Sequence, residues 1–264
     1  KTGIDITPHI EEMVVASPLT FSRYLGAEVV LTGLCSDFPA GHRHYLGPNL
    51  NLYEESDIRI LTPPPADPFD CPDLESIDRT FAGELLVLGR RRATGLVLAA
   101  WGRNHAILRT AQGRISRADF SDGPLPSVGE TIDVSGFPHT DLYHLDLSRA
   151  TWRKAEKPMT GREDPPENVS AEELLTDGQG AKCVSIQHHG RCVRLCGTVL
   201  TLPVTEGHDG IFNLKCGNFI IPVDISACGQ GMTDIAIGCH IRATGICVIR
   251  STRQHPTALI PTLD

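Results

Sequence analysis

The chain has 264 residues, of which 41% are hydrophobic and 5% aromatic, and its formal net charge is −8. This length suits one large domain or a few smaller ones, and the negative charge argues against binding a phosphate backbone as the main task. The sequence contains no run of the roughly 18–20 apolar residues needed to span a membrane. Any export signal or membrane anchor is therefore expected outside this chain.

In chain order, the first strands are predicted at 28–35, 51–53 and 57–61, within an incomplete or diverged module at 1–64. Residues 65–77 follow as a proline-rich linker, because proline fixes φ and favours extended backbone.

The next module spans 78–157. Its five strands are predicted at 94–100, 106–110, 115–120, 131–135 and 143–147. A second linker, 158–181, contains a short helix that begins after Ser170, where Glu173 completes a capping box. The last module, 182–264, repeats the same strand order.

One pattern recurs along the chain: a glycine, an alternating apolar run, and a second glycine seven positions later. Full copies occupy 26–33, 129–136, 190–197 and 238–245, and a degenerate copy ends at Gly95. The alternation is typical of half-buried strands. Glycine inside such a strand marks a bulge or the bend where a small sheet curls closed.

The copies fall into two phases, Gly95 then Gly136, and Gly197 then Gly245, which indicates two complete modules. Five short strands per module predict an all-β chain of tandem OB-like five-stranded barrels, with short helices and proline-rich linkers. A sandwich of similar strand count is the alternative. We expect Gly95 to match Gly197, and Gly136 to match Gly245, when the two modules are superposed.

Seven of the nine cysteines lie between Cys183 and Cys247. The closest pair, Cys192 and Cys196, falls on one strand about 13 Å apart, too far to share a zinc ion or a disulfide. We therefore expect buried small hydrophobes, and no metal or other cofactor. A cross-strand disulfide such as Cys196 with Cys247 stays open.

No motif for catalysis is found in the sequence: a phosphate-binding loop and a nucleophile elbow are both absent. His188 and His189 precede a predicted strand and are expected to be exposed loop residues. We therefore expect no catalytic activity from this chain.

If the module at 78–157 binds a ligand, OB geometry places the site on the face of strands 2 and 3 and the adjoining loops. Aromatic, imidazole and guanidinium groups there could stack on or hydrogen-bond a sugar, nucleotide or peptide. The candidate ligand-binding residues are Trp101, Arg103, His105, Arg109, Arg117, His139 and Tyr143. The alternative is an ordinary polar sheet face, with Trp101 covering one end of the barrel.

The segment 26–35, followed by 52–61 and the prolines at 63–65, resembles a recurrent part of the extracytoplasmic sensor regions of bacterial two-component histidine kinases. Residues 238–247 resemble the same segment, and residues 93–153, with 135–138, resemble the intervening module. In that family, tandem OB-like modules precede a membrane helix and the kinase core.

The resemblance implies a non-catalytic, periplasmic sensory region that recognises an unknown small ligand or protein partner. A homodimer is compatible with it, and membrane contact would come only through segments outside this chain. The cysteine content instead suits the cytoplasm. Two other functions are the alternatives: binding of single-stranded nucleic acid, which needs a basic groove with stacking aromatics, and a purely structural or dimerisation role. No nucleic-acid partner is expected.

Overall fold

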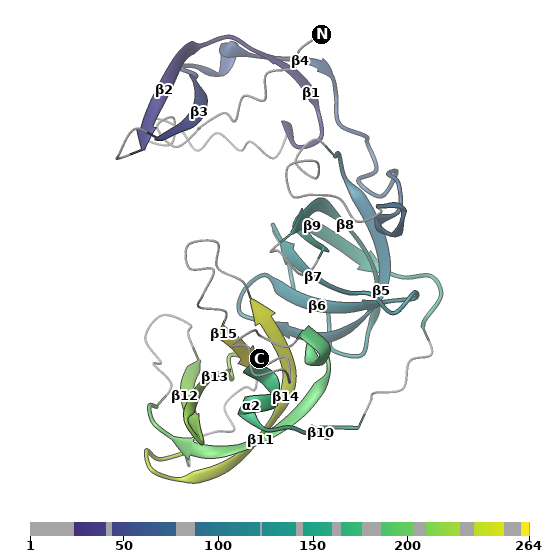
Figure 1. Ribbon diagram of the computed structural model, residues 1–264. Helices are drawn as coiled ribbons and strands as arrows, with labels where there is room; N and C mark the ends of the chain where they lie inside the picture. The colour runs from purple at the N-terminus through teal and green to yellow at the C-terminus, as the bar shows by residue number, and fades with distance from the viewer. Residues whose placement is uncertain are drawn as a thin grey trace. The chain divides into compact units, whose positions relative to one another are not determined.

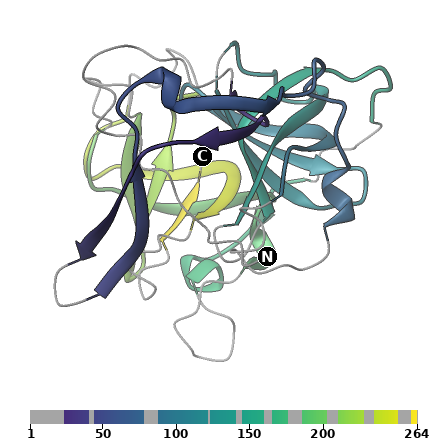
Figure 2. The same ribbon diagram turned by 90° about the horizontal axis from the view of Figure 1, so that it is seen from above.

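The computed structural model describes residues 24–40, 44–77, 88–121, 123–140, 145–159, 165–175, 186–202, 210–227, 235–250 and 260–263. The chain divides into two compact units, 1–70 and 71–264. Both views show strands as the dominant element of the described residues (Figure 1, Figure 2).

The described part of the first unit contains two separate strand pairs. Strand β1 (Glu28–Leu31) pairs antiparallel with β4 (Ile58–Thr62), and β2 (Leu34–Ala40) pairs with β3 (His44–Asn51). The short 3₁₀ turn η3 (Glu55–Asp57) leads into β4. The run predicted as one strand at 28–35 is therefore divided between two sheets, and the described residues of this unit form no closed barrel.

The second unit begins with a closed barrel formed by five strands: β5 (Arg91–Trp101), β6 (His105–Thr110), β7 (Ile115–Phe120), β8 (Thr131–Thr140) and β9 (Leu145–Lys154). They close in the order β5-β6-β7-β9-β8, and only the β7–β9 pair is parallel. Inward positions alternate with outward ones, so that Ala106 and Leu108 of β6 lie in the core and their neighbours face out.

A second ring follows, made by β11 (Cys192–Val199), β12 (Ile211–Cys216), β13 (Phe219–Asp224), β14 (His240–Arg250) and β15 (Ile260–Leu263). Its order is β11-β12-β13-β15-β14, with a β11–β14 pairing that closes it and a parallel β13–β15 pair. Both rings thus have the strand order 1-2-3-5-4, which is that of the OB fold. The predicted all-β tandem of OB-like barrels is confirmed.

The glycine repeat occupies equivalent positions in the two barrels. Gly95 lies opposite Ile132 on the strand 1–strand 4 pair of the first barrel, and Gly197 lies opposite Ile241 on that of the second. Gly136 lies opposite the residue four positions before Gly95. Gly245 likewise lies opposite the residue four positions before Gly197. The predicted matching of Gly95 with Gly197, and of Gly136 with Gly245, is confirmed by this shared register.

Each glycine of the pattern has its own physical reason. The leading glycines Gly26, Gly129, Gly190 and Gly238 all have φ between 73° and 89°, a region that side chains rarely tolerate. The second glycine allows close approach: a Cβ at Gly136 would lie 2.9 Å from the Ser148 carbonyl, and one at Gly197 would lie 2.6 Å from that of Lys215. The repeat therefore marks the turn before a strand and the crowded bend within it.

Both linkers contribute to the barrels they join. Leu74, in the 3₁₀ turn η4 (Leu74–Ser76), and Ile77 lie in the core of the first barrel, so this barrel includes residues that the sequence assigned to the linker at 65–77. In the second linker, β10 (Glu167–Asn168) pairs with β11, and the helix α2 (Ala171–Leu175) packs Ala171 and Leu174 into the second core.

The predicted capping box is confirmed. The Ser170 N–H donates to Glu173 Oε2 at 2.6 Å, and the Glu173 N–H donates to Ser170 Oγ at 3.1 Å.

The possibility of a Cys196–Cys247 disulfide is ruled out, because neither residue forms a disulfide in the structure. Cys247 points into the second core, whereas Cys196 is exposed and lies opposite Arg242. In the ranges that the structure describes, no three His, Cys, Asp or Glu side chains group as metal ligands. In the same ranges, no helix is long and apolar enough to cross a membrane.

Candidate functional site

An apolar cluster joins the two barrels within the second unit. Trp101 at the end of β5 and Ile107 of β6 pack with Val248 of β14, and all three are almost fully buried. Ile115 and Ile246 add to the cluster from β7 and β14. Part of the outer face of strands 2 and 3 in the first barrel is therefore occupied by the second barrel.

This cluster corrects the expected position of Trp101. The sequence placed its indole on an open turn at the barrel mouth, but the side chain is only 3% exposed. The reason is that Val248 and Ile246 lie on the outward face of β14, and such apolar surface is stabilised by removal from water.

His188 and His189 were expected to be exposed, and this prediction is also wrong. Both are buried, at 5% and 7% exposure, because the chain before β11 runs along β14. The Gly190 N–H donates to the Cys247 carbonyl at 2.8 Å, and the Ile249 N–H donates to His189 Nδ1 at 3.0 Å. The two histidines therefore support β14 at the place where it meets the first barrel.

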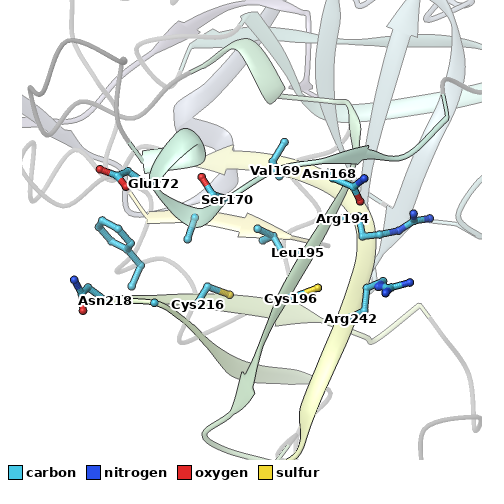
Figure 3. Close-up of a pocket in the computed structure, with 13 residues that line it drawn as sticks. Asn168, Val169, Ser170, Glu172, Arg194, Leu195, Cys196, Cys216, Asn218 and Arg242 are labelled. Carbon is cyan, nitrogen blue, oxygen red and sulfur yellow. The ribbon is translucent and has the colours of Figure 1, made fainter.

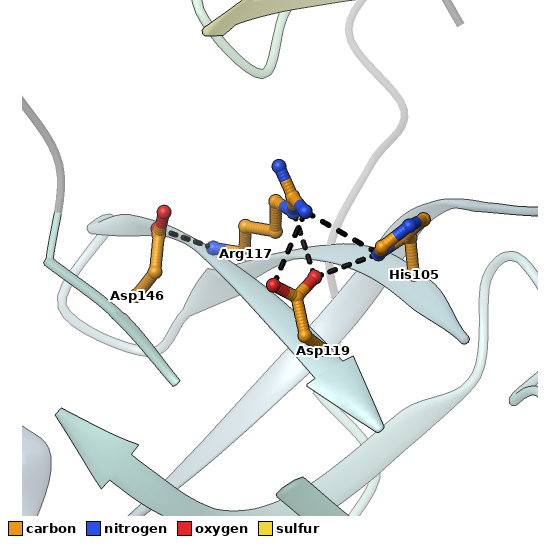
Figure 4. A network of polar contacts seen from close by, with 4 residues as sticks. All are labelled: His105, Arg117, Asp119 and Asp146. Atoms are coloured by element: carbon orange, nitrogen blue, oxygen red, sulfur yellow. Dashed lines mark hydrogen bonds and ion pairs between the residues drawn. The ribbon is translucent and has the colours of Figure 1, made fainter. Parts of the chain in front are cut away.

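A polar network occupies the remaining face of the first barrel (Figure 4). Asp119 of β7 accepts two hydrogen bonds from Arg117, from Nε to Oδ1 at 2.8 Å and from Nη2 to Oδ2 at 3.1 Å. His105 Nδ1 lies 2.7 Å from Asp119 Oδ1, and its ring centroid is 5.6 Å from that of Trp101. The Arg117 backbone N–H donates to Asp146 Oδ1 at 2.9 Å. Guanidinium, imidazole and carboxylate groups are thus held together beside the buried indole.

The network changes the pKa of Asp119. Burial raises the pKa of this carboxyl, but hydrogen bonds from His105 and Arg117 and the charge of Arg117 outweigh burial and hold it below the usual 3.8. The carboxyl is 35% exposed, so solvent weakens the effect.

We expect Asp119→Asn to be less stable than the native chain at neutral pH, and the difference to vanish in acid. A carboxyl whose folded pKa is lowered contributes stability above its unfolded pKa and loses it as the pH falls through the folded value. The difference should therefore be present above the usual 3.8 and shrink as the pH falls below it. Urea denaturation of both proteins across this range measures it; a pH-independent difference would contradict the pairing.

The other candidate residues are scattered. Arg109 lies on the same outward face of β6, beyond Ile107, and is half-buried. Arg103 is exposed in the β5–β6 turn, and His139 is exposed on β8, opposite Asp146. Tyr143 lies outside the described residues. Of the seven candidates, the structure brings Trp101, His105 and Arg117 together.

The second barrel has a cavity of about 680 Å³ that the sequence analysis did not identify (Figure 3). It lies between β11, the β12–β13 turn and the segment around α2. Its lining combines charged, polar, thiol and apolar side chains: Asn168, Val169, Ser170, Ala171, Glu172, Arg194, Leu195, Cys196, Cys216, Gly217, Asn218, Phe219 and Arg242. Burial, and to a smaller degree the neighbouring Cys196, raises the pKa of the Cys216 thiol, which favours its neutral form.

A sequence signal for this cavity did exist. Arg194 and Arg242 each stand four residues after the leading glycine of a repeat copy, Gly190 and Gly238. Because these copies form the paired strands β11 and β14, the two arginines share one outward face. The repeat therefore carries a repeated positive charge in addition to the glycines that shape its strands.

Comparison with known proteins identifies no family. No family model matches the sequence, and no curated protein matches it. Among solved structures, the chain is similar to one described as "Structural mimicry for functional antagonism", with 15% identity and a TM-score of 0.31 over 65% of this chain and 87% of that one.

Proposed function

We propose that this chain is the non-catalytic, extracytoplasmic sensory region of a bacterial signalling protein of the histidine kinase type, and that it binds a small ligand or a protein partner. The observation that carries the proposal is the cavity of about 680 Å³ in one of two OB barrels. Its size is in the range of small-molecule sites, and its polar lining supplies groups that could orient a ligand. The segments that anchor and transmit would lie outside this chain.

The chemistry of the two polar sites favours binding over catalysis. The network on the first barrel holds His105, Arg117 and Asp119 but no nucleophile. The lining of the cavity holds two thiols but no histidine that could activate them. Both sites offer groups that position a ligand, and neither places a thiol beside a histidine.

Single-stranded nucleic acid is the weaker alternative, because OB proteins bind it by stacking bases on aromatic side chains. On the first barrel, the face of strands 2 and 3 is covered at Ile107, and Trp101 is buried. On the second barrel, the outward residues of the described strands β12 and β13 are Ile211, Asn213, Lys215, Ile220, Pro222 and Asp224, and none of them is aromatic. Phe219, at the β12–β13 turn, packs against the second core.

We expect the chain to bind a fluorescent single-stranded DNA no more tightly than about 10⁻⁶ M at physiological salt. The physical reason is its net charge of −8 and the shortage of open stacking surface. Fluorescence anisotropy at two salt concentrations measures this. Nanomolar binding that weakens steeply with salt would reject the sensory proposal in favour of nucleic-acid binding.

The sensory proposal itself is tested by a thermal-shift screen of sugars, nucleotides, amino acids and short peptides on the whole chain. At least one class should raise the melting temperature, since a ligand that binds only the folded state stabilises it. Each ligand that raises the melting temperature is then tested on the Arg103→Ala and Arg242→Gln variants. A stabilisation lost in Arg103→Ala assigns the ligand to the first barrel, and one lost in Arg242→Gln assigns it to the second. A chain that no class stabilises would instead support the structural or dimerisation role.

A further inference from the structure

We propose that the cavity of the second barrel is a site for a small organic anion, whose carboxylate or phosphoryl group is held by Arg194 and Arg242. The inference rests on the proposed binding function and names its ligand class. It is carried by the position of the two guanidinium groups, by their lack of a counter-charge, and by a comparison with the first barrel.

The strand register places the two arginines together. Arg194 of β11 lies opposite Thr244, and Arg242 of β14 lies opposite Cys196, so the arginines are diagonal neighbours on one outward face. Long side chains at diagonal positions are within reach of each other. Figure 3 shows both side chains extended along the same side of the cavity. Two positive charges are thus held at one end of it.

Neither charge is neutralised by the described part of the chain. Arg194 Nε donates to Thr244 Oγ1 at 3.3 Å, and no described carboxylate lies within ion-pair distance of Arg194 or Arg242. Elsewhere in the second unit, arginines do pair: Arg114 with Glu75 at 3.0 Å, and Arg117 with Asp119 at 2.8 Å. Two positive charges held near each other repel, and a bound anion would reduce that repulsion.

The first barrel serves as an internal comparison. In the second barrel, Arg194 and Arg242 each stand three positions before a glycine of the repeat, Gly197 or Gly245. The equivalent residues of the first barrel, three positions before Gly95 and Gly136, are Arg92 and Asp133. In the first barrel, then, one of the two places carries a carboxylate, and Asp133 also accepts a hydrogen bond from Thr94 Oγ1 at 2.6 Å. Only the second barrel has two positive charges at this pair of positions.

The rest of the lining limits the ligand. Asn168 and Asn218 supply amide groups, and Leu195 and Phe219 supply apolar surface. A volume of about 680 Å³ exceeds what an inorganic ion fills, which favours an organic molecule that carries the anionic group. Glu172 lies on the side of the cavity away from the arginines in Figure 3. The anionic group is therefore expected at the arginine end, where forked guanidinium donors suit carboxylate and phosphate oxygens.

Isothermal titration of the whole chain at low ionic strength tests the site, with succinate and inorganic phosphate as probes and succinamide as the uncharged isostere of succinate. We expect at least one anion to bind and succinamide not to bind. Binding of succinate alone would assign a carboxylate ligand, and binding of phosphate alone would assign a phosphoryl ligand. Arg194→Gln and Arg242→Gln should each raise the dissociation constant roughly tenfold or more.

Two further variants sharpen the test. Arg242→Asp recreates the charge pattern of the first barrel and should abolish anion binding, whereas Arg59→Gln, an exposed arginine of the first unit, should leave it unchanged. Circular dichroism confirms that each variant is folded. Affinity that is equal in Arg242→Gln and in the native chain would overturn the site. Failure of both anions to bind would overturn the ligand class, while hits from the wider thermal-shift screen would leave the sensory proposal standing.

Discussion

Trp101→Ala is expected to lower the free energy of unfolding of the second unit by about 3 kcal/mol, the range for truncation of a buried aromatic side chain. The indole is 3% exposed and packs with Ile107 and Val248 at the junction of the barrels. Its loss leaves a cavity between two barrels rather than inside one. Hydrogen exchange should therefore become faster both at the end of β5 and in the last residues of β14.

Arg103→Ala is the matched control, because Arg103 lies two residues away and is exposed in the β5–β6 turn. Surface substitutions of this kind usually change stability by less than about 0.5 kcal/mol. Urea denaturation followed by circular dichroism compares the two variants with the native chain. Equal stability of the Trp101 and Arg103 variants would mean that the cluster between the barrels does not form in solution.

Gly197→Ala is expected to destabilise the second barrel by about 2–3 kcal/mol. A Cβ at this position would lie 2.6 Å from the Lys215 carbonyl oxygen, 2.7 Å from Leu214 Cγ and 2.8 Å from Cys216 Sγ. The carbonyl belongs to the backbone of the neighbouring strand, so one strand must shift, and overpacking of a well-packed site typically costs 1–3 kcal/mol. Hydrogen exchange on β11 and β12 locates the loss.

Gly89→Ala controls for the glycine itself. A Cβ there meets no atom within 4 Å, so this substitution should stay within about 1 kcal/mol of the native chain or stabilise it slightly, by restricting the unfolded state. If Gly197→Ala is as stable as Gly89→Ala, the close approach of β11 and β12 at this bend is not the reason for the glycine.

The two barrels of the second unit were predictable from the sequence, apart from the linker residues that complete their cores. Alternation predicted the strands, and the spacing of Gly95, Gly136, Gly197 and Gly245 predicted two equivalent barrels. The leading glycines are a local signal, because a left-handed φ requires glycine at a turn. The glycines within the strands mark a bend where a partner strand approaches closely, so the sequence shows their position and the structure shows the contact. The capping box of Ser170 and Glu173 is also a local signal, because its two partners lie three residues apart.

The burial of Trp101, His188 and His189 and the position of the cavity depend on long-range packing. These three residues lie at the ends of strands in the sequence, where exposed residues are common. They are nevertheless buried, because β14 packs across the first barrel. The residues of β14 that cover Trp101 lie more than a hundred positions after it in the sequence. The cavity likewise depends on the pairing of β11 with β14, which sets Arg194 beside Arg242 across 48 positions of sequence. Periodicity shows which face of a strand a side chain takes. It does not show what covers that face, because that depends on the long-range packing of one barrel against another.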